Sequence, residues 1–361
     1  MEEKGKKGRI DYTLLLIVVL LVVIGLVILY STSAYNGQVK FHDSFYYLKK
    51  QAFATVLGIV LMLFVAGMDY HIWQRLAVFG YLAAVALSVA VMLFGREING
   101  SKRWLALGPF SFQPSEFAKV ALILFLADLV TKNVKTIGKM WTLCRIMFWI
   151  LPIVGLVGAS NLSTAIIILG IGVILIFVAS PKYAQFAMMG IAGACFMGIF
   201  LALESYRLER LAIWRNPEKY EKGYQTLQGL YAIGSGGVFG VGIGNSVQKL
   251  GFVPEAQNDM IFSIICEELG LAGAGIIVFL FLLLIWRFFL IASGSRDLFG
   301  ALIATGAMAH MMIQVILNIA VVTNTIPNTG ITLPFISYGG TSVMFLLIEM
   351  GIVLSVSQVV D

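Results

Sequence analysis

The stretch that decides the fold runs Val253-Pro254-Glu255-Ala256-Gln257-Asn258-Asp259-Met260-Ile261-Phe262 and continues to Cys266-Glu267-Glu268-Leu269-Gly270. It sets acidic residues at the mouth of a long apolar run. A carboxylate at a membrane edge is costly unless it faces water, a cation or a partner, so Asp259 is a candidate functional group. The residues leave a second interpretation open, in which Pro254, Glu255 and Asp259 start a helix whose dipole favours acids in its first turn.

The composition places the chain in a membrane. Of its 361 residues 59% are hydrophobic and 12% charged, and the mean hydropathy is +0.92, which is too apolar for a soluble globular domain. The apolar runs are about 20 residues long, enough to cross a hydrocarbon core as helices, and they lack the alternating pattern of a membrane barrel. The first run exceeds the length of a signal-peptide core and is expected to stay as a span. The sequence predicts an all-α polytopic membrane protein, a single domain over residues 1–361 with about ten spans, near Tyr12–Tyr30, Gln51–Gly67, Ile72–Phe94, Pro114–Val130, Trp141–Gly158, Leu162–Ala179, Tyr183–Leu203, Met260–Phe289, Leu298–Val322 and Ser342–Val359.

The distribution of basic residues predicts the orientation. Lys4, Lys6, Lys7 and Arg9 favour a cytoplasmic N-terminus, and an even number of spans returns the C-terminus to the same side. Residues 204–258 then form a large extracytoplasmic loop between spans seven and eight. Several other basic residues fall outside under this orientation, close to span ends.

This loop is predicted to hold helices at the outer membrane surface. Residues 208–215 are amphipathic at near-helical spacing, and a second helical piece follows Gly223. The glycine-rich run 234–245 must bend or approach another segment closely. It matches neither GxGxxG nor GxxxxGK[ST], so a nucleotide-binding fold is rejected. Its backbone amides could still line an anion site, although flexible turns between helices are the commoner explanation for such a run.

Other kinds of site find little support. The chain carries no nucleic-acid-binding module, and its net charge of +6 suits anionic headgroups or an anionic substrate. Cys144, Cys195 and Cys266 lie far apart within predicted helices, so they are expected to be small core residues rather than disulfides or metal ligands. The three histidines do not cluster in sequence, and a histidine-based site is not expected.

A second charged group is predicted at another outer loop. Glu116 follows Pro114 at the start of a span, where an acid suits the helix dipole. Lys119 lies about 8 Å into that span, so it either extends outward or pairs with an anion in the bundle; an ion pair with Glu116 at i, i+3 is equally compatible. Arg103 beside Trp104 is either an interfacial anchor or a substrate contact, and two basic residues near one apolar groove suit a diphosphate.

The last outer loop, residues 324–342, predicts a groove. It has no charged residue, two prolines and three glycines, so its backbone is irregular. Irregular backbone at membrane depth survives only where protein or a wet cavity surrounds it. Asp128 and Glu349 are further charges inside predicted spans, and their partners are not evident from the sequence.

Four ordered motifs resemble the SEDS family (shape, elongation, division and sporulation) over almost the whole chain. They are Gly100-Ser101-Lys102-Arg103-Trp104 with Gln113-Pro114-Ser115-Glu116, Ala232-Ile233-Gly234-Ser235-Gly236-Gly237 through Gly244-Asn245-Ser246, Pro254-Glu255 with Asp259-Met260-Ile261-Phe262 and Glu267-Glu268-Leu269-Gly270, and Leu333-Pro334-Phe335-Ile336-Ser337-Tyr338-Gly339-Gly340. Thr329-Gly330 resembles the FtsW and SpoVE branch more than the RodA branch. Asn161 departs from the aspartate of many members, and Asn258 and Met260 from their threonine and phenylalanine.

The resemblance implies a peptidoglycan glycosyltransferase that polymerises lipid II on the outer face of the cytoplasmic membrane, for cell division or cell shape. It makes Asp259 the essential acid, and we expect it to act as general base. Arg103, Lys119 and Glu116 are expected at the substrate, with Arg103, Lys119 or a divalent ion such as Mg²⁺ or Mn²⁺ stabilising the leaving diphosphate. The resemblance also implies a class B penicillin-binding transpeptidase as partner, within the division or elongation machinery.

Two other functions fit the same residues. A flippase that moves lipid II across the membrane would also need many helices, interrupted spans and buried charges. A noncatalytic scaffold for cell-wall assembly would tolerate loss of Asp259. No internal inverted repeat is apparent in the sequence, which slightly disfavours a transporter.

Overall fold

The chain folds into a helical bundle in a computed structural model that describes residues 10–98, 101–107, 110–187, 190 and 212–360. Eight of the helices in these ranges are long and apolar enough to cross a membrane. Many large apolar side chains on their outer faces are exposed, as lipid contact requires. The longer helices are α1 (Tyr12–Phe41), α2 (Tyr46–Ala66), α3 (His71–Phe94), α4 (Pro114–Asn133), α5 (Met140–Ser160), α6 (Leu162–Ala179), α9 (Tyr224–Ser235), α10 (Ile261–Gly294), α11 (Leu298–Val322) and α12 (Gly340–Ser357).

The predicted spans agree closely with these helices. The bounds of α6 and α11 are identical to the prediction, and those of α3 and α5 differ by one or two residues at an end. α1 runs 11 residues beyond its predicted end at Tyr30, because its polar last turns pack against the segment 246–268 and are buried at Ser31, Thr32 and Ser33. The predicted seventh span lies mostly outside the described residues. The same holds for residues 208–211 of the predicted interfacial helix, whereas 212–215 are helical.

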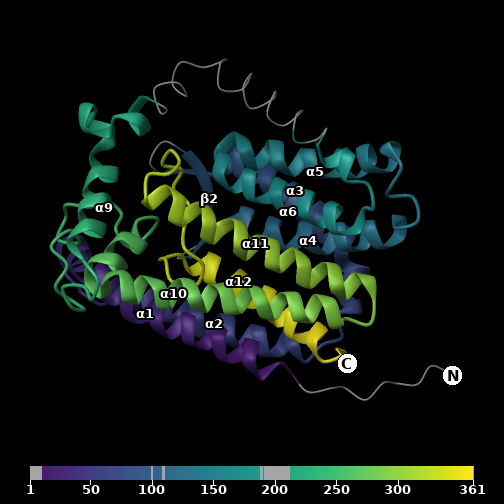
Figure 1. Cartoon of the computed structure of the whole chain (residues 1–361), viewed down its shortest axis with the longest axis horizontal. Helices are drawn as coiled ribbons and strands as arrows, with labels where there is room; N and C mark the ends of the chain where they lie inside the picture. The colour runs from purple at the N-terminus through teal and green to yellow at the C-terminus, as the bar shows by residue number, and fades with distance from the viewer. Residues whose placement is uncertain (1–9, 99–100, 108–109, 188–189, 191–211, 361) are drawn as a thin grey trace.

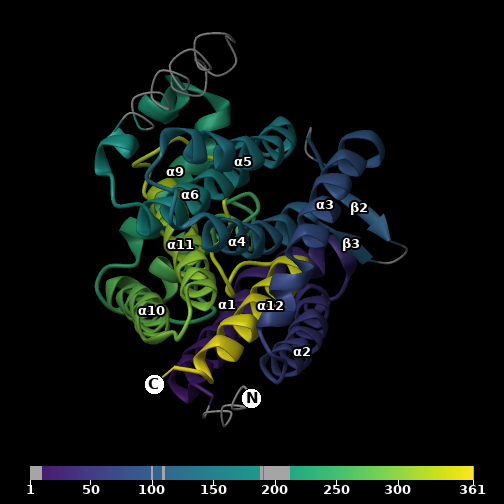
Figure 2. The same cartoon turned by 90° about the vertical axis from the view of Figure 1, so that its right-hand side faces the viewer.

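α4 occupies the middle of the bundle, with α3, α5, α6, α11 and α12 packed around it (Figure 2). It is not among the eight apolar helices, because Glu116, Lys119, Asp128 and Lys132 lie within its 20 residues. Since other helices cover it on most sides, these charges face protein or cavity rather than lipid. Asp128 accepts hydrogen bonds from Lys132 (2.6 Å) and Gln74 (3.1 Å), which identifies its partners.

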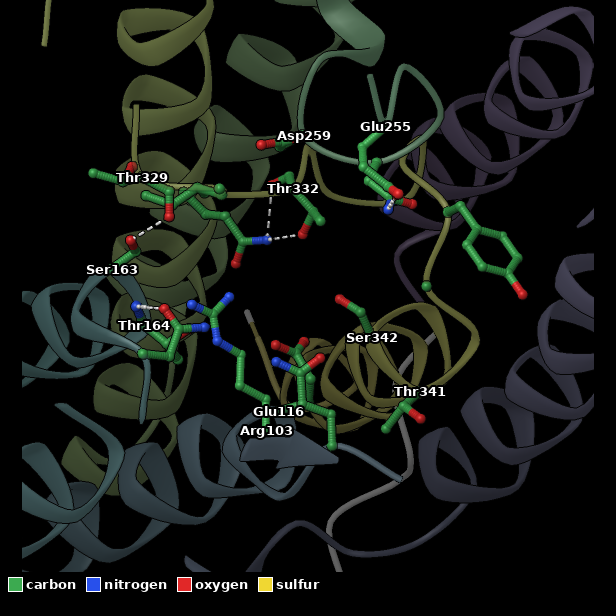
Figure 3. A pocket seen from close by; sticks show the side chains of 18 of the residues that line it. Arg103, Glu116, Ser163, Thr164, Glu255, Asp259, Thr329, Thr332, Thr341 and Ser342 are labelled. Carbon is green, nitrogen blue, oxygen red and sulfur yellow. Dashed lines mark hydrogen bonds between the residues drawn. The ribbon is translucent and has the colours of Figure 1, made fainter. Parts of the chain in front are cut away.

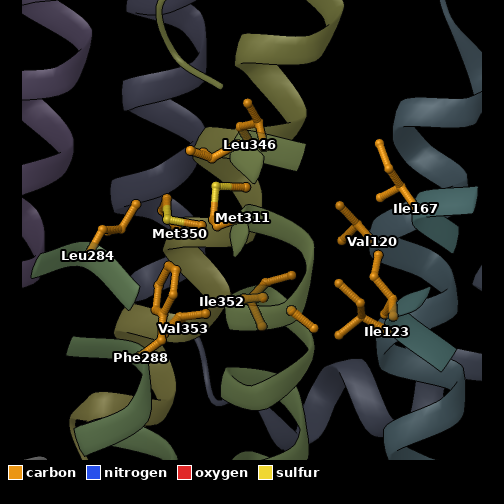
Figure 4. Close-up of a cluster of buried hydrophobic side chains, with 14 of the residues drawn as sticks. Val120, Ile123, Ile167, Leu284, Phe288, Met311, Leu346, Met350, Ile352 and Val353 are labelled. Carbon is orange, nitrogen blue, oxygen red and sulfur yellow. The ribbon is translucent and has the colours of Figure 1, made fainter. Parts of the chain in front are cut away.

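The apolar core fills the space between α4, α6, α10, α11 and α12. Figure 4 shows Met311, Leu346 and Met350 interleaved between the helices, with Phe288 and Val120 on opposite sides. Cys266 belongs to this core as expected, but Cys144 is exposed, so that prediction was wrong for Cys144. The cause is the helix face: Cys144 points away from the neighbours that bury Leu143 on α5. Cys195 lies outside the described residues.

The long α10 bends at Gly270, one of the glycines at which the sequence allows a bend. Gly270 has φ 68° and ψ −169°, a conformation that a side chain would strain. The glycine-rich run docks at this break and satisfies the freed backbone groups. The amides of Val241 and Gly242 donate to the carbonyls of Glu267 and Glu268, each at 2.9 Å, and the amides of Leu271 and Ala272 donate back to Gly237 and Val238.

This docking explains the glycines. A Cβ at Gly240 would lie 2.2 Å from the carbonyl oxygen of Glu268, and one at Gly236 1.8 Å from that of Cys266. The close approach expected for this run is therefore confirmed, as is the helix after Gly223, which is α9. Since the amides of Val241 and Gly242 bind protein carbonyls, they are not available to an anion.

A small antiparallel sheet before α4 was not predicted. It is formed by β1 (Arg96–Ile98), β2 (Ser101–Leu107) and β3 (Phe110–Phe112), in that order. β2 and β3 pair with Leu105 opposite Phe112. The strands are short and their charged and apolar residues do not alternate regularly, so the sequence shows no period-two signal there.

α1 begins and α12 ends at one end of the bundle, and α9 lies at the other (Figure 1). The sheet and the irregular loops 254–260 and 323–339 also lie toward the α9 end. We call this the loop end, and it holds the site described next.

Candidate functional site

A large pocket opens at the loop end, with a volume of about 1580 Å³. Its walls come from α2, β2, the first turns of α4, α6 and α9, residues 213–214, α11, the loops 254–260 and 323–339, and the start of α12. The groove predicted beside the loop 324–342 is confirmed, because residues 327–332 and 338–342 line it. This one pocket is lined by all four candidate residues, Arg103, Glu116, Lys119 and Asp259, although the first and last lie 156 positions apart in the sequence.

Asp259 lies near the end of the loop 254–260, one residue before Met260, which is the N-cap of α10. The loop is bonded to the opposite wall: the Tyr338 amide donates to the Gln257 carbonyl (2.9 Å), and the Ser337 hydroxyl donates to the Asn258 carbonyl (2.6 Å). The Asn318 side-chain amide donates to the carbonyl of Asp259 itself, at 3.0 Å. The backbone at Asp259 is thus fixed from both sides, while its carboxyl group faces the pocket (Figure 3).

The surroundings of Asp259 make it a stronger base than an ordinary aspartate. Burial in the pocket wall raises the pKa of its carboxyl group to about 6, the nearby Glu255 carboxylate adds to the increase, and Arg103 opposes it. The side-chain nitrogen of Gln225 on α9 lies 3.5 Å from its carboxyl group, which is at the limit of a hydrogen bond. Asp259 is therefore mostly ionised at neutral pH but gains a proton far more readily than an exposed aspartate.

Glu116 and Lys119 form the local ion pair that their spacing allowed. The Lys119 ammonium lies 3.1 Å from a Glu116 oxygen, and the two side chains are only 2% and 8% exposed. Lys119 also donates to the Gln314 side-chain oxygen at 3.0 Å. Because both charges line the pocket, the pair lies between the apolar bundle and the cavity.

Arg103 projects from β2 toward the pocket. Its Nε–H donates to the Ser160 carbonyl at the end of α5 (3.0 Å), and Figure 3 shows the guanidinium pointing into the cavity. Trp104 lines the pocket beside it. The structure thus brings Arg103 to the pocket wall, and its contact with substrate stays a prediction.

Sequence reasoning missed several polar residues of the pocket wall. Ser163 donates to the Thr329 carbonyl at 2.6 Å, and Gln314 donates to the Thr332 carbonyl at 3.1 Å. Asn161, in place of the aspartate of many family members, lines the pocket, and its side chain caps α6 by accepting from the Thr164 amide. Polar residues at the start of α6 and at every fourth position of α11 were the available signal.

Comparisons with known proteins agree with this geometry. The family model described as cell cycle protein, covering FtsW, RodA and SpoVE, matches residues 12–361. Stage V sporulation protein E of Bacillus subtilis (strain 168) is 40% identical over 366 residues, 98% of each chain. The probable peptidoglycan glycosyltransferase FtsW of Trichlorobacter lovleyi is 35% identical over 96% of this chain and 93% of its own.

Solved structures show the same fold. A chain in a structure on the coordination of polymerization and crosslinking by a peptidoglycan synthase complex superposes with a TM-score of 0.83. It is 29% identical and the match covers 96% of this chain and 97% of that one. The rod shape determining protein RodA of Thermus thermophilus matches with a TM-score of 0.72 and 28% identity over 96% of each chain. The chain is therefore a multi-pass membrane protein of the FtsW/RodA/SpoVE family.

Proposed function

We propose that this chain is a peptidoglycan glycosyltransferase that polymerises lipid II with Asp259 as its general base. The observation that carries the proposal is the pocket itself, where one carboxyl group of raised pKa faces a wall of charged side chains (Figure 3). Relatives named probable peptidoglycan glycosyltransferase match nearly the whole chain. The pocket is also larger than typical drug-sized sites of about 300–1,000 Å³, as two lipid-linked saccharides require.

Glycan extension needs a base at the acceptor. A sugar hydroxyl attacks the anomeric carbon of the donor, a new glycosidic bond forms, and the bond from that carbon to the diphosphate breaks. The hydroxyl proton passes to the Asp259 carboxylate, and the bonding electrons leave with the diphosphate. A carboxyl group with a pKa of about 6 is ionised at neutral pH and yet basic enough to accept that proton as the bond forms.

The leaving diphosphate needs positive charge. Arg103 offers a planar guanidinium that binds phosphate oxygens in pairs, and Lys119 offers an ammonium at the same wall. Glu116 offsets much of the Lys119 charge before substrate binds. The diphosphate would therefore compete with Glu116 for the ammonium, and that contact would strengthen as negative charge builds on the leaving group.

A divalent ion such as Mg²⁺ or Mn²⁺ is part of the proposal. The described residues contain no cluster of three histidine, cysteine or acidic side chains that could hold one. Mg²⁺ usually binds one or two protein carboxylates and takes its other ligands from substrate phosphates and water, so a smaller donor set suffices. Glu255 lines the pocket, and the side-chain oxygen of Asn258 beside it is buried with no hydrogen-bond partner in the described part of the chain. These oxygens fit such an ion, which when bound would supply charge to the diphosphate.

Orientation and partner follow from the same function. We place the loop end outside and both termini in the cytoplasm, because peptidoglycan is assembled outside the membrane. A similar chain belongs to a peptidoglycan synthase complex that coordinates polymerization with crosslinking. We therefore propose that a class B penicillin-binding transpeptidase, within the division or elongation machinery, binds this chain.

Polymerisation of purified lipid II in detergent tests the function, with the protein alone and with a cognate transpeptidase. Glycan chains are expected from wild type, and both Asp259→Asn and Asp259→Ala should lose at least about 100-fold in rate, as removal of a general base does. Asp69→Asn is the matched control, because it removes an exposed carboxylate next to His71 at the opposite end of the bundle. Equal product from all variants would remove Asp259 as the base. No product from any of them would favour a flippase or a scaffold, since detergent leaves no second compartment for transport.

A further inference from the structure

A polar stripe on α11 connects the apolar bundle to the pocket. His310, Gln314 and Asn318 lie four residues apart on one face of the helix and are 1%, 2% and 0% exposed. Polar groups buried in an apolar core are costly unless they are hydrogen-bonded. Each of the three is bonded to another element, so the stripe acts as a connector between the walls of the site.

The hydrogen-bond partners of the Gln314 side-chain amide determine its orientation. Its side-chain oxygen lies 3.0 Å from the Lys119 ammonium, which can only donate, and its nitrogen lies 3.1 Å from the Thr332 carbonyl, which can only accept. If the amide were reversed, its nitrogen would face the Lys119 ammonium, donor against donor, and its oxygen would face the Thr332 carbonyl, acceptor against acceptor. The same oxygen lies 2.9 Å from His310 Nε2, so this ring nitrogen carries a proton and donates it.

His310 is held in turn by Glu349 of α12. His310 Nδ1 lies 2.8 Å from a Glu349 carboxyl oxygen, and both residues are almost fully buried. The two ring nitrogens therefore bind different elements, Nε2 the Gln314 oxygen on α11 and Nδ1 the Glu349 carboxyl group on α12, so the ring is held from both sides. Among the residues that the structure describes, the other Glu349 oxygen has no hydrogen-bond partner, and His310 is the side chain that binds this carboxyl group.

The far end of the stripe binds the loop that carries the proposed base. Asn318 donates to the Ile331 carbonyl at 2.6 Å and to the Asp259 carbonyl at 3.0 Å. One face of α11 therefore contacts both the Lys119 ammonium and the Asp259 backbone. Since α11 is a continuous helix, it sets the separation of these two groups across the pocket.

We propose that His310, oriented by Glu349, is a positioning residue for Lys119. It acts through Gln314: the His310 Nε2–H holds the Gln314 oxygen in place, and that oxygen holds the Lys119 ammonium at the pocket wall. Without this donor the Gln314 oxygen keeps Lys119 as its one side-chain donor and can shift along the pocket wall. Lys119 is then held less firmly by Gln314 and moves toward Glu116, away from the diphosphate. The diphosphate as ligand rests on the proposed function, whereas the chain of contacts from Glu349 to Lys119 does not.

Two matched variants separate this role from simple packing. His310→Gln can place its amide donor near the position of Nε2, whereas His310→Asn is too short to reach Gln314. Met311→Ala is the control, because it removes apolar core packing from the same turn of α11 and leaves every side chain of the polar stripe in place (Figure 4). All variants are compared in detergent at matched folding, judged by thermal unfolding.

The first readout is binding of farnesyl diphosphate, followed by the fluorescence of Trp104 and Trp214, which line the pocket. We expect His310→Asn and Lys119→Met each to weaken binding about tenfold, as loss of a charge-assisted contact does, and the double variant to bind no more weakly than Lys119→Met alone. His310→Gln and Met311→Ala should bind like wild type. Additive losses, wild-type binding by His310→Asn, or an equal loss in Met311→Ala would overturn the proposal.

Two further measurements keep the test decisive. Should His310→Asn fail to fold, Gln314→Leu cuts the same link, and wild-type binding by that variant would count against the proposal. In polymerisation assays His310→Asn should lower kcat about tenfold or more, since small misplacements of a catalytic contact have large effects, with a smaller change in KM. If wild type binds as expected but polymerises nothing, the proposed function fails while the positioning role stands.

Discussion

Two buried glutamate–lysine pairs show how similar contacts serve different ends. Lys119 and Glu116 lie 3.1 Å apart with side chains 2% and 8% exposed, and Lys249 and Glu268 lie 2.6 Å apart with side chains 7% and 0% exposed. The first pair lies on one helix and lines the pocket. The second joins the segment after the glycine-rich run to α10, and Ser31 of α1 donates to the same glutamate at 2.7 Å.

The difference between the pairs is access, not chemistry. The Lys249–Glu268 pair joins α10, just before its bend at Gly270, to the segment around Lys249 and to α1. The neighbouring Glu267 accepts hydrogen bonds from the Ser246 hydroxyl and the Val247 amide. The Lys119 pair has a cavity on one side and can exchange partners with a ligand. Burial and charge alone therefore do not identify a functional group, whereas a buried charge at a cavity wall does.

The largest effect is expected at the enclosed pair. Lys249→Met should lower the free energy of unfolding by about 3–5 kcal/mol, because Glu268 is left as an uncompensated buried charge. The polymerisation rate per folded molecule should stay within about threefold of wild type, because neither Lys249 nor Glu268 lines the pocket. Thermal unfolding in detergent and rates corrected for the folded fraction measure both quantities.

A second substitution checks the cause of that loss. In Lys249→Met/Glu268→Leu the unpaired charge is gone, and much of the stability should return, since apolar pairs often replace buried ion pairs without cost. A double variant as unstable as Lys249→Met would mean that packing at the bend, rather than the orphaned charge, causes the loss.

The next largest effect is expected at the pocket pair, where the substitution should reduce activity strongly and stability only slightly. Lys119→Met should reduce the polymerisation rate about 100-fold, the range seen when one electrostatic contact to a transition state is removed. Its cost in stability should be smaller than that of Lys249→Met, because water in the pocket can solvate Glu116. Initial rates at several lipid II concentrations, with thermal unfolding of the same samples, test both statements.

Lys132→Met provides the matched control on the same helix. Lys132 pairs with Asp128 at 2.6 Å, but its side chain is 63% exposed and it lies at the opposite end of α4 from the pocket. Its activity should remain close to that of wild type. If Lys132→Met loses as much activity as Lys119→Met, the effect reports the charge of α4 and not a contact in the pocket.

The spans could be predicted because they depend on local composition. Leu162–Ala179 and Leu298–Val322 were bounded correctly from hydropathy and flanking polar residues alone. The sheet around Arg103 and the extension of α1 could not be predicted, because both depend on contacts with distant segments. For the same reason the sequence predicted a close approach by the glycine-rich run but did not show that the run docks at Gly270.

The site was predicted in part. Arg103, Glu116, Lys119 and Asp259 were each singled out, and the fold brings all four to one pocket. The sequence did not indicate that Gln314 joins Lys119 to His310, since a lone histidine in an apolar helix has many possible partners. The raised pKa of Asp259 was equally out of reach, because it depends on burial by loops that lie far away in sequence.

The smallest effect expected is a shift of the pH profile of the polymerisation rate. This profile would distinguish protonation of Asp259 in the pocket from unfolding of the protein. Because the pKa of Asp259 is about 6, the rate should halve near pH 6 and fall about tenfold for each further unit of decrease in pH, as the base becomes protonated.

The contribution of Asp259 to the stability of the fold changes with pH in the opposite direction. The folded carboxyl binds a proton more tightly than the unfolded one, with its ordinary pKa of 3.8, so protonation of Asp259 stabilises the fold as the pH falls through 6 toward 4.

Glu255→Gln sharpens this prediction by changing the charge next to the base. The Glu255 carboxylate helps to raise the pKa of Asp259, whereas a neutral amide would not, so the acid side of the kcat/KM profile should move to lower pH by a fraction of a unit. Asp69→Asn, far from the pocket, should leave the profile in place. If the kcat/KM profile of Glu255→Gln stays in place, its inflection belongs to a group other than Asp259. If activity is lost at the same pH at which the protein unfolds, acid acts on the enclosed pair Lys249–Glu268 rather than on the pocket.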